Sequence, residues 1–282
     1  RFGALGDGLI HVRVVIGHFC SGAMIAASKV YLDAGILAIT PSATLPAVTE
    51  QPGWNVLRLA ARDDAQADIA AARILADDAN AKVAIISDGQ PTMRSLVARL
   101  KGKLSSGSEH MVKPGTANFT DMANEVKAEA PTVVYLAMSA SDAGNLAKAL
   151  KENNVAARLY GPDLLLNEVY WERAGEAGEG TRVTFAADPL TFTNRFRVSQ
   201  VLPESAGSEG ATLPSYAAVE TFAAAAKSAG VNNGRAMADW LKGGASVPTI
   251  LGDVRFDSRG DLATQRFTWY RWSAGQFAED QN

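Results

Sequence analysis

Polar side chains follow two apolar segments near the start of the chain. Ser21 comes after residues 12–17, and Ser42 and Thr44 come after residues 36–39. Both apolar segments have the composition of buried strands. In an open parallel sheet, ligands bind outside the carboxyl ends of the strands. A helix that begins there offers free backbone N–H groups and the positive end of its dipole, which suit a carboxylate. The Ser42 carbonyl could accept a hydrogen bond from an ammonium group.

A simpler interpretation of the same residues stays open. Ser21 is a suitable N-cap for a helix predicted over residues 23–34, and Pro41 is suited to turning the chain. Local chemistry alone favours this interpretation over a ligand site. Further evidence is needed to choose between the two.

The sequence shows no motif for catalysis. It contains no His-Glu-x-x-His, no Walker A loop, no Gly-x-Ser-x-Gly elbow and no Gly-x-Gly-x-x-Gly. The chain has three histidines and one cysteine, so metal-ligand spacings are missing as well. We therefore predict no catalytic residue, no metal and no cofactor, and we expect the protein not to be an enzyme.

The bulk composition is that of a globular protein. The 282 residues are 47% hydrophobic and 20% charged, with a formal net charge of −3. This length is sufficient for two domains. The chain has no dense Lys/Arg tract, so we do not expect nucleic acid as a partner. It also has no apolar run of the roughly 18 residues that a membrane helix needs, so we predict no membrane span.

Short apolar runs alternate with longer segments of helical period along most of the chain. This alternation predicts an α/β fold of parallel sheets flanked by helices. Near the end the pattern changes, and residues 253–256 and 266–272 have the pattern of an antiparallel hairpin.

Several segments in order resemble the branched-chain amino-acid-binding proteins of ABC transporters, which bind leucine, isoleucine or valine. The matching segments are residues 15–22, 31–44, 160–163, 215–218 and 252–261. The resemblance implies the type I periplasmic binding protein fold, with two Rossmann-like lobes joined by three crossings and a ligand cleft between them. It also implies a periplasmic protein that binds an amino acid or a similar ligand and passes it to a permease.

The resemblance implies a role for each matched site residue. Ser21 and Thr44 would bind the α-carboxylate of the ligand, and the Ser42 carbonyl would accept from its α-ammonium group. Asp163 would pair with the ammonium group from the other lobe. The remaining residues implied to line the site are Phe19, Cys20, Ala43, Thr92 and Ser139.

Two features depart from the family pattern. Thr92 and Ser139 stand where relatives place aromatic residues, which predicts a polar or larger amino acid in preference to leucine. The initial strand–helix–strand unit of the family, about 30 residues or more, has no counterpart in this sequence. We therefore expect an exposed strand edge and a homodimer.

The predicted lobes are residues 1–61 with 188–249, and residues 62–187 with 250–282. The crossings are expected near residues 59–63, 186–189 and 248–253, where the alternation is interrupted. Two alternative functions stay open. One is a ligand-sensing receptor or regulator on the same scaffold, and the other is a truncated paralogue that no longer binds ligand.

Overall fold

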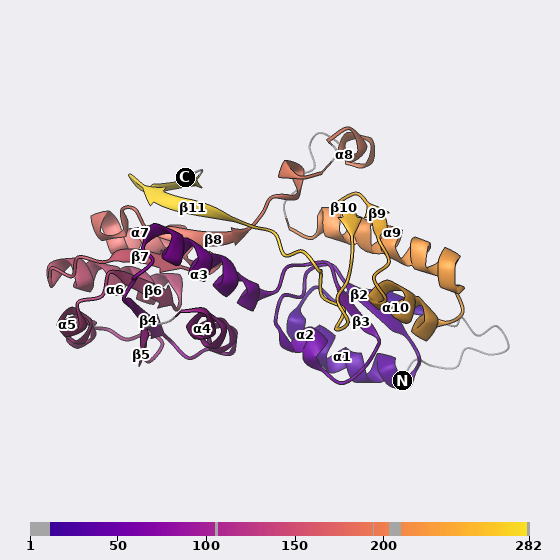
Figure 1. Cartoon of the computed structure of the whole chain (residues 1–282), viewed down its shortest axis with the longest axis horizontal. Helices are drawn as coiled ribbons and strands as arrows, with labels where there is room; N and C mark the ends of the chain where they lie inside the picture. The colour runs from indigo at the N-terminus through magenta and orange to yellow at the C-terminus, as the bar shows by residue number, and fades with distance from the viewer. Residues whose placement is uncertain (1–11, 105–106, 194, 203–209, 281–282) are drawn as a thin grey trace. The chain divides into compact units, whose positions relative to one another are not determined.

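The computed structural model describes residues 12–104, 107–193, 195–202 and 210–280, and the chain forms two compact α/β units (Figure 1). Unit 1 consists of Arg1–Arg62 and Asp188–Gln265, and unit 2 of Asp63–Ala187 and Arg266–Asn282. Each unit has a sheet flanked by helices, and the predicted fold class is confirmed. No helix in the described ranges is both long enough and apolar enough to cross a membrane.

Unit 1 is built on a three-stranded parallel sheet. The strands are β1 (Val14–Ile16), β2 (Leu37–Thr40) and β3 (Val56–Arg58), in the order β1-β2-β3. Its longer helices are α1 (Ser21–Asp33), α9 (Thr212–Ala229) and α10 (Gly234–Lys242). The smaller elements are α2 (Ala47–Glu50), α8 (Arg195–Val201), β9 (Val247–Thr249) and β10 (Gly252–Val254).

Alternate residues of this sheet pack into two different cores. Leu37, Ile39 and Leu57 belong to the cluster that contains residues of α9 and α10. Ile36 and Ala38 belong to the cluster that contains residues of α1. Successive side chains of a strand point to opposite faces, so both faces of β2 are covered and the whole strand is buried.

Unit 2 contains a seven-stranded mixed sheet in the order β12-β11-β8-β7-β6-β4-β5. Its parallel part consists of β4 (Val83–Ser87), β5 (Gly107–Met111), β6 (Val133–Ala137), β7 (Arg158–Gly161) and β8 (Arg182–Ala186). The last two strands, β11 (Phe267–Ser273) and β12 (Gln276–Glu279), are antiparallel. The helices are α3 (Gln66–Asp77), α4 (Pro91–Lys103), α5 (Thr120–Glu129), α6 (Ala140–Glu152) and α7 (Glu168–Ala174).

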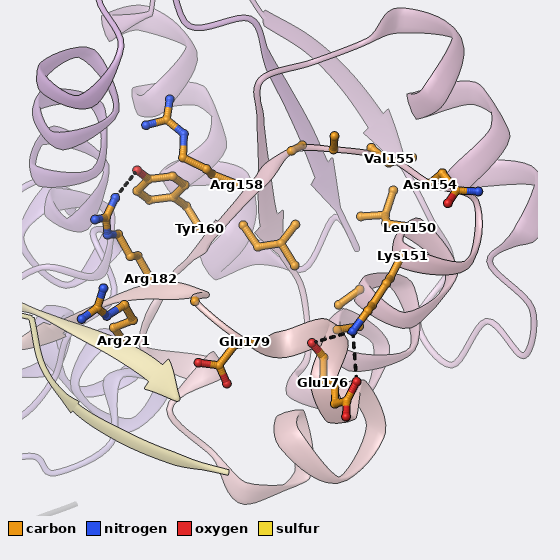
Figure 2. Close-up of a pocket in the computed structure, with 16 residues that line it drawn as sticks. Leu150, Lys151, Asn154, Val155, Arg158, Tyr160, Glu176, Glu179, Arg182 and Arg271 are labelled. Atoms are coloured by element: carbon orange, nitrogen blue, oxygen red, sulfur yellow. Dashed lines mark hydrogen bonds and ion pairs between the residues drawn. The ribbon is translucent and has the colours of Figure 1, made fainter. Parts of the chain in front are cut away.

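A pocket of about 620 Å³ lies at one end of the strands of this sheet (Figure 2). Its lining includes Arg158 and Arg182, the first residues of β7 and β8, so the pocket lies at the amino ends of these strands. Arg158 pairs with Asp78, and Arg182 pairs with Asp77. Because ligands of open parallel sheets bind at the opposite, carboxyl edge, we do not assign the ligand site to this pocket.

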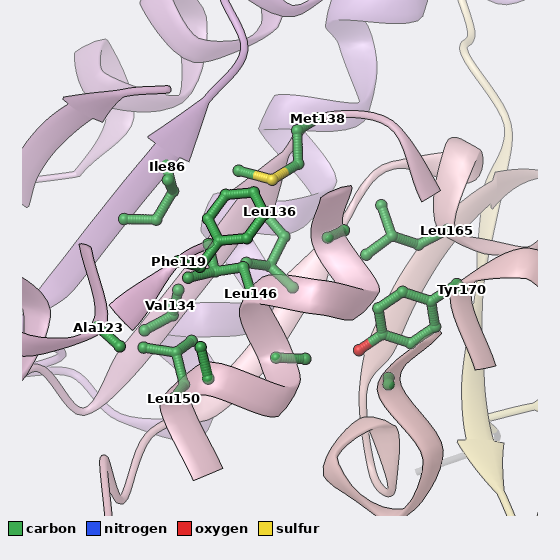
Figure 3. Packing of buried hydrophobic residues seen from close by; sticks show 14 of the residues in the cluster. Ile86, Phe119, Ala123, Val134, Leu136, Met138, Leu146, Leu150, Leu165 and Tyr170 are labelled. Atoms are coloured by element: carbon green, nitrogen blue, oxygen red, sulfur yellow. The ribbon is translucent and has the colours of Figure 1, made fainter. Parts of the chain in front are cut away.

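The core of unit 2 also divides between the two faces of the sheet. Ile86, Val134 and Leu136 pack with residues of α5 and α6 (Figure 3). Their neighbours Ile85 and Tyr135 pack on the other face with residues of α3 and α4. Burying a side chain of leucine size is worth about 1.5–3 kcal/mol, so these two layers hold the parallel strands in a fixed register.

The tail of the chain differs from the sequence prediction. Residues 253–256 do not form a hairpin with residues 266–272, because β10 pairs with β9 while β11 pairs with β8 and β12. Val247 and Val254 are buried in the core of unit 1. The chain therefore passes to unit 2 only after Gln265, and the predicted third crossing near residues 248–253 is wrong. The other two boundaries, after Arg62 and after Ala187, fall inside the segments 59–63 and 186–189.

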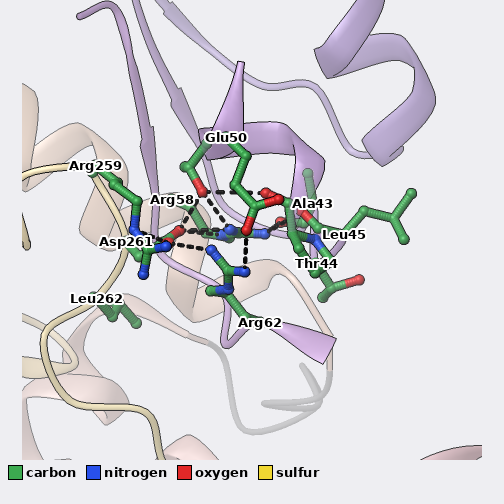
Figure 4. A network of polar contacts seen from close by, with 12 residues as sticks. Ala43, Thr44, Leu45, Glu50, Arg58, Arg62, Arg259, Asp261 and Leu262 are labelled. Atoms are coloured by element: carbon green, nitrogen blue, oxygen red, sulfur yellow. Dashed lines mark hydrogen bonds and ion pairs between the residues drawn. The ribbon is translucent and has the colours of Figure 1, made fainter. Parts of the chain in front are cut away.

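A buried ion-pair network joins the tail segment of unit 1 to its sheet (Figure 4). The side chains of Arg58 and Asp261 are 0% and 2% exposed, and Arg58 Nη2 lies 2.5 Å from Asp261 Oδ1. Arg62 Nη1 donates to the other oxygen of Asp261 at 2.9 Å. Thr49 Oγ1 donates to Asp261 and accepts from Arg58, both at 2.7 Å. Both charges are thus balanced and hydrogen-bonded, as buried charges must be.

This network sets the protonation of Asp261. Burial pushes the pKa of its carboxyl upward, but the charge of Arg58 and the hydrogen bonds from Arg62, Arg58 and Thr49 outweigh burial. The pKa therefore lies below the ordinary value of 3.8. A lowered folded-state pKa means that Asp261 adds stability at neutral pH and that this contribution is lost as the pH falls below 3.8.

The substitution Asp261→Asn should lower the free energy of unfolding by about 3–5 kcal/mol, because Arg58 would keep a buried charge without its partner. Urea unfolding at pH 7 followed by circular dichroism measures this change. As a control, Asp239→Asn breaks the exposed pair with Arg235 and should leave stability nearly unchanged. An equal effect of the two substitutions would contradict a dominant role for the buried pair.

Candidate functional site

The segments that follow β1 and β2 are tied together at the carboxyl edge of the unit 1 sheet. Thr40 Oγ1 donates to the His18 carbonyl at 2.8 Å and accepts from the Ala43 N–H at 3.1 Å. Ser42 Oγ donates to the Phe19 carbonyl at 2.9 Å. Because β1 and β2 are parallel neighbours, their ends meet, and these hydrogen bonds fix the two loops as one surface.

Ser21 joins the same two loops, and it does so with its side chain. Its Oγ accepts from the Thr44 N–H at 3.1 Å and from the Leu45 N–H at 3.2 Å. The prediction that Ser21 is the N-cap of α1 is wrong, because Cys20 occupies that position and no side chain caps the helix. A hydroxyl has two acceptor lone pairs and one O–H donor. With both lone pairs engaged, Ser21 can offer further partners only its O–H.

Arg58 holds this loop through the backbone on both sides of Thr44 (Figure 4). Its Nη1 donates to the carbonyls of Ala43 and Leu45 at 3.2 and 2.7 Å. The hydroxyl of the half-buried Thr44 makes no hydrogen bond within the described part of the chain. The network thus holds Thr44 by its backbone and leaves its side-chain donor for another partner.

The other predicted residues of unit 1 differ in exposure. Phe19 is 72% exposed, and Cys20 is an exposed free thiol. Ala43 is fully buried in the core beside α1. Phe19 and Cys20 could therefore contact a ligand directly, while Ala43 supports the loop.

The three predicted residues of unit 2 lie at the carboxyl edge of its parallel strands. Thr92 lies in the first turn of α4, which follows β4. Ser139 is the N-cap of α6, which follows β6, and its Oγ accepts from the Asp142 N–H at 3.2 Å. Asp163 begins the 3-10 turn after β7. Since β4, β6 and β7 are adjacent and parallel, these residues follow one edge of the sheet.

Asp163 has a perturbed acidity. Burial raises the pKa of its carboxyl above the ordinary value of 3.8, against the hydrogen bonds from Gln66 and from the Leu164 backbone, which lower it. The Asp163 N–H donates to Gln66 Oε1 at 3.1 Å. A half-buried acid with a raised pKa at a strand end fits a ligand-binding group.

The sequence analysis missed Gln66. This residue is 2% exposed and is the first residue of α3, where it precedes Ala67, Ala70 and Ala71 on a buried helix face. The sequence contained a signal for this residue, because its amide stands at the start of an alanine-rich apolar helix face. Its partners come from β8 and from the loop after β7, and only the folded chain reveals them.

A model of the family described as periplasmic binding protein matches residues 10–276. The chain belongs to this family. As a periplasmic binding protein it is 33% identical to the Leu/Ile/Val-binding protein BraC3 of Rhizobium johnstonii over 279 residues, which cover 96% of this chain and 75% of that protein. The resemblance predicted from the sequence is confirmed.

Solved structures agree with this assignment. A putative branched-chain amino acid ABC transporter protein from Rhodospirillum rubrum is similar with a TM-score of 0.75 and 23% identity, over 98% of this chain and 81% of that one. The substrate-binding protein LivJ of Streptococcus pneumoniae, in complex with isoleucine, has a TM-score of 0.66 and 18% identity, over 95% and 79% of the chains. At these identities the structures show the fold.

The substitution Asp163→Asn should change how stability depends on pH. A carboxyl with a raised folded-state pKa stabilises the fold when protonated, and this contribution is lost as the pH rises from 3.8 through the folded-state pKa. The asparagine variant should lack that loss. Urea unfolding between pH 3.5 and 7.5, a range chosen as roughly the titration window, measures the difference.

The control for this comparison is Glu152→Gln on the exposed end of α6. This variant should follow the wild-type pH profile. Identical profiles for wild type and Asp163→Asn would show that Asp163 does not titrate abnormally.

Proposed function

We propose that this periplasmic binding protein captures an amino acid or an amino-acid-like ligand outside the cytoplasm and delivers it to the permease of an ABC transporter. The observation that carries the proposal is the geometry of Ser21. Its oxygen is saturated by two backbone N–H groups, so its O–H points to an acceptor such as a carboxylate. The names of relatives, including Leu/Ile/Val-binding proteins, support the same ligand class.

Donors of three kinds converge at this edge of unit 1. They are the Ser21 O–H, the Thr44 hydroxyl and the first-turn N–H groups of α1, which lack intrahelical acceptors. The residues of this first turn, Gly22 and Ala23, are exposed. Hydrogen bonds to an ionised group are the stronger ones, and the helix dipole favours negative charge here. A ligand α-carboxylate satisfies all of these donors.

We propose two acceptors for the ligand ammonium group, the Ser42 carbonyl of unit 1 and the Asp163 carboxylate of unit 2. In the proposed complex Asp163 is ionised, because an ammonium group nearby favours the charged form of the acid. Thr92 and Ser139 would then lie toward the ligand side chain. Their small size keeps our prediction of a polar or larger amino acid in place, to be tested against leucine, isoleucine and valine.

The family assignment places related proteins in the periplasm, and we propose the same location for this one. We propose a transport role in preference to sensing, because one similar structure is named as a putative branched-chain amino acid ABC transporter and another as a transporter substrate-binding protein. We also propose that the protein binds ligand without transforming it. The predicted homodimer stays a prediction, which light scattering of the purified protein checks.

Calorimetric titration with each common amino acid tests the proposal. We expect a set of chemically similar α-amino acids to bind. The amines obtained by removing their carboxyl groups should bind far more weakly. Ser21→Ala should weaken binding about tenfold or more, since it removes a donor to a charged group and leaves two N–H groups without an acceptor.

The matched control is Ser28→Ala on the same helix. Ser28 Oγ donates to the Ile25 carbonyl at 2.8 Å, a hydrogen bond within α1, so its loss should leave affinity unchanged. If no amino acid binds the wild-type protein, the proposal is wrong. Equal affinity for an amino acid and its decarboxylated amine would exclude the carboxylate role of Ser21.

A further inference from the structure

Asp163 begins a short 3-10 turn, Asp163–Leu165, which no side chain caps. Such a turn contributes few hydrogen bonds of its own. An acid that must meet a ligand charge in one direction therefore needs support from elsewhere in unit 2. The structure provides this support through one buried amide, the side chain of Gln66.

Gln66 connects three elements of unit 2. It is the first residue of α3, and its side-chain oxygen accepts from the Asp163 N–H at 3.1 Å and from Thr184 Oγ1 at 2.7 Å. Thr184 lies on β8 and is fully buried. The loop that carries Asp163 is therefore anchored to both the helix and the neighbouring strand.

These two bonds also fix which way the amide faces. A carbonyl oxygen accepts two hydrogen bonds, and both positions on Oε1 are filled by donors. A reversed amide would place its NH₂ group against the Asp163 N–H, so that two donors would face each other. Hydrogen bonding with the Gln66 side chain also acts to lower the pKa of the Asp163 carboxyl, against burial, which raises it.

The surroundings of Asp163 contain few other charges. The titratable neighbour is Tyr135 on β6, whose hydroxyl is buried without a hydrogen-bond partner in the described part of the chain. From β8 comes the neutral Thr184, and from α3 the neutral Gln66. Among the described residues of unit 2, Gln66 is therefore the side chain that favours the ionised form of Asp163.

We propose that Gln66 is a positioning residue for the ligand site: it orients Asp163 and keeps its carboxylate ready for the ligand ammonium group. The inference rests on the proposed function for the identity of that group. The contact between Gln66 and Asp163 does not depend on a ligand, so its effect can be measured in ligand-free protein.

The first experiment uses ligand-free protein. The carbon-13 shift of the Asp163 side-chain carboxyl is followed through a pH titration in the wild type and in Gln66→Met, a change of similar size that removes the amide. The pKa of Asp163 should rise by about one unit or more in the variant, since a hydrogen bond to the charged form is lost. An unchanged pKa would overturn the proposal whatever the protein binds.

The second experiment compares two probes, the α-amino acid that binds the wild type most tightly in the calorimetric series and the same compound without its amino group. Gln66→Met should weaken binding of the amino acid about tenfold or more at neutral pH, the scale of a lost hydrogen bond to a charged group. The affinity for the compound without an amino group should change by less than about threefold, the variation expected of a site that lost no contact. Equal losses for both probes would show a general structural effect and reject positioning.

The control variant is Thr181→Val. Thr181 is fully buried in unit 2, and its hydroxyl hydrogen-bonds with Tyr170 at 2.7 Å. This variant loses one buried hydrogen bond away from Asp163, so it should lower the melting temperature without changing the affinity for the amino acid. If it weakens amino-acid binding as much as Gln66→Met does, Gln66 has no special role. If the wild type binds no amino acid, the proposed function fails, and the titration of Asp163 alone decides the role of Gln66.

Discussion

The contact between Arg58 and Asp261 fixes several segments of unit 1, because the neighbours of a fully buried guanidinium must lie where they can accept its hydrogen bonds. Its donors reach the Asp261 carboxylate, the Thr49 hydroxyl and the carbonyls of Ala43 and Leu45. Each of these groups would lose a hydrogen bond from a charged donor if Arg58 moved. The C-terminal segment of unit 1 and the loop after β2 are therefore held by the same side chain.

This arrangement explains how a loop can serve as a binding surface. Binding groups must be held in place before the ligand arrives, or the cost of ordering them weakens affinity. Here the backbone on both sides of Thr44 is fixed by Arg58, and the Thr44 N–H is fixed by Ser21. The side-chain hydroxyls of Ser21 and Thr44 are then free to donate from a rigid base.

The proposed role of unit 2 is the electrostatic opposite of that of unit 1. In the proposed complex, unit 1 offers donors to a negative group, whereas Asp163 of unit 2 accepts from a positive group. A permanent cation beside Asp163 would occupy it, as Arg58 and Arg62 occupy Asp261. On our proposal the neutral amide of Gln66 orients the acid without balancing its charge, and burial raises the pKa of Asp163.

The sequence by itself determined the alternation of strands and helices, the α/β class and the family. It also placed the polar residues after the strands, because the period of apolar residues and the order of turns are local properties. Ser21, Ser42 and Thr44 were predicted to follow strands, and they do. Details of the caps and of the tail hairpin were wrong, since they depend on which strand pairs with which.

Only the tertiary structure decided the partners of these residues. Arg58 and Asp261 are 203 positions apart, and Gln66 and Thr184 are 118 apart, so no local pattern connects them. The same reason applies to the third crossing, which lies after Gln265 because the β9–β10 segment is buried in the core of unit 1. Residue type and spacing identify groups that can bind. Which of their hydrogen-bonding positions remain unfilled depends on contacts that form only when distant segments pack together.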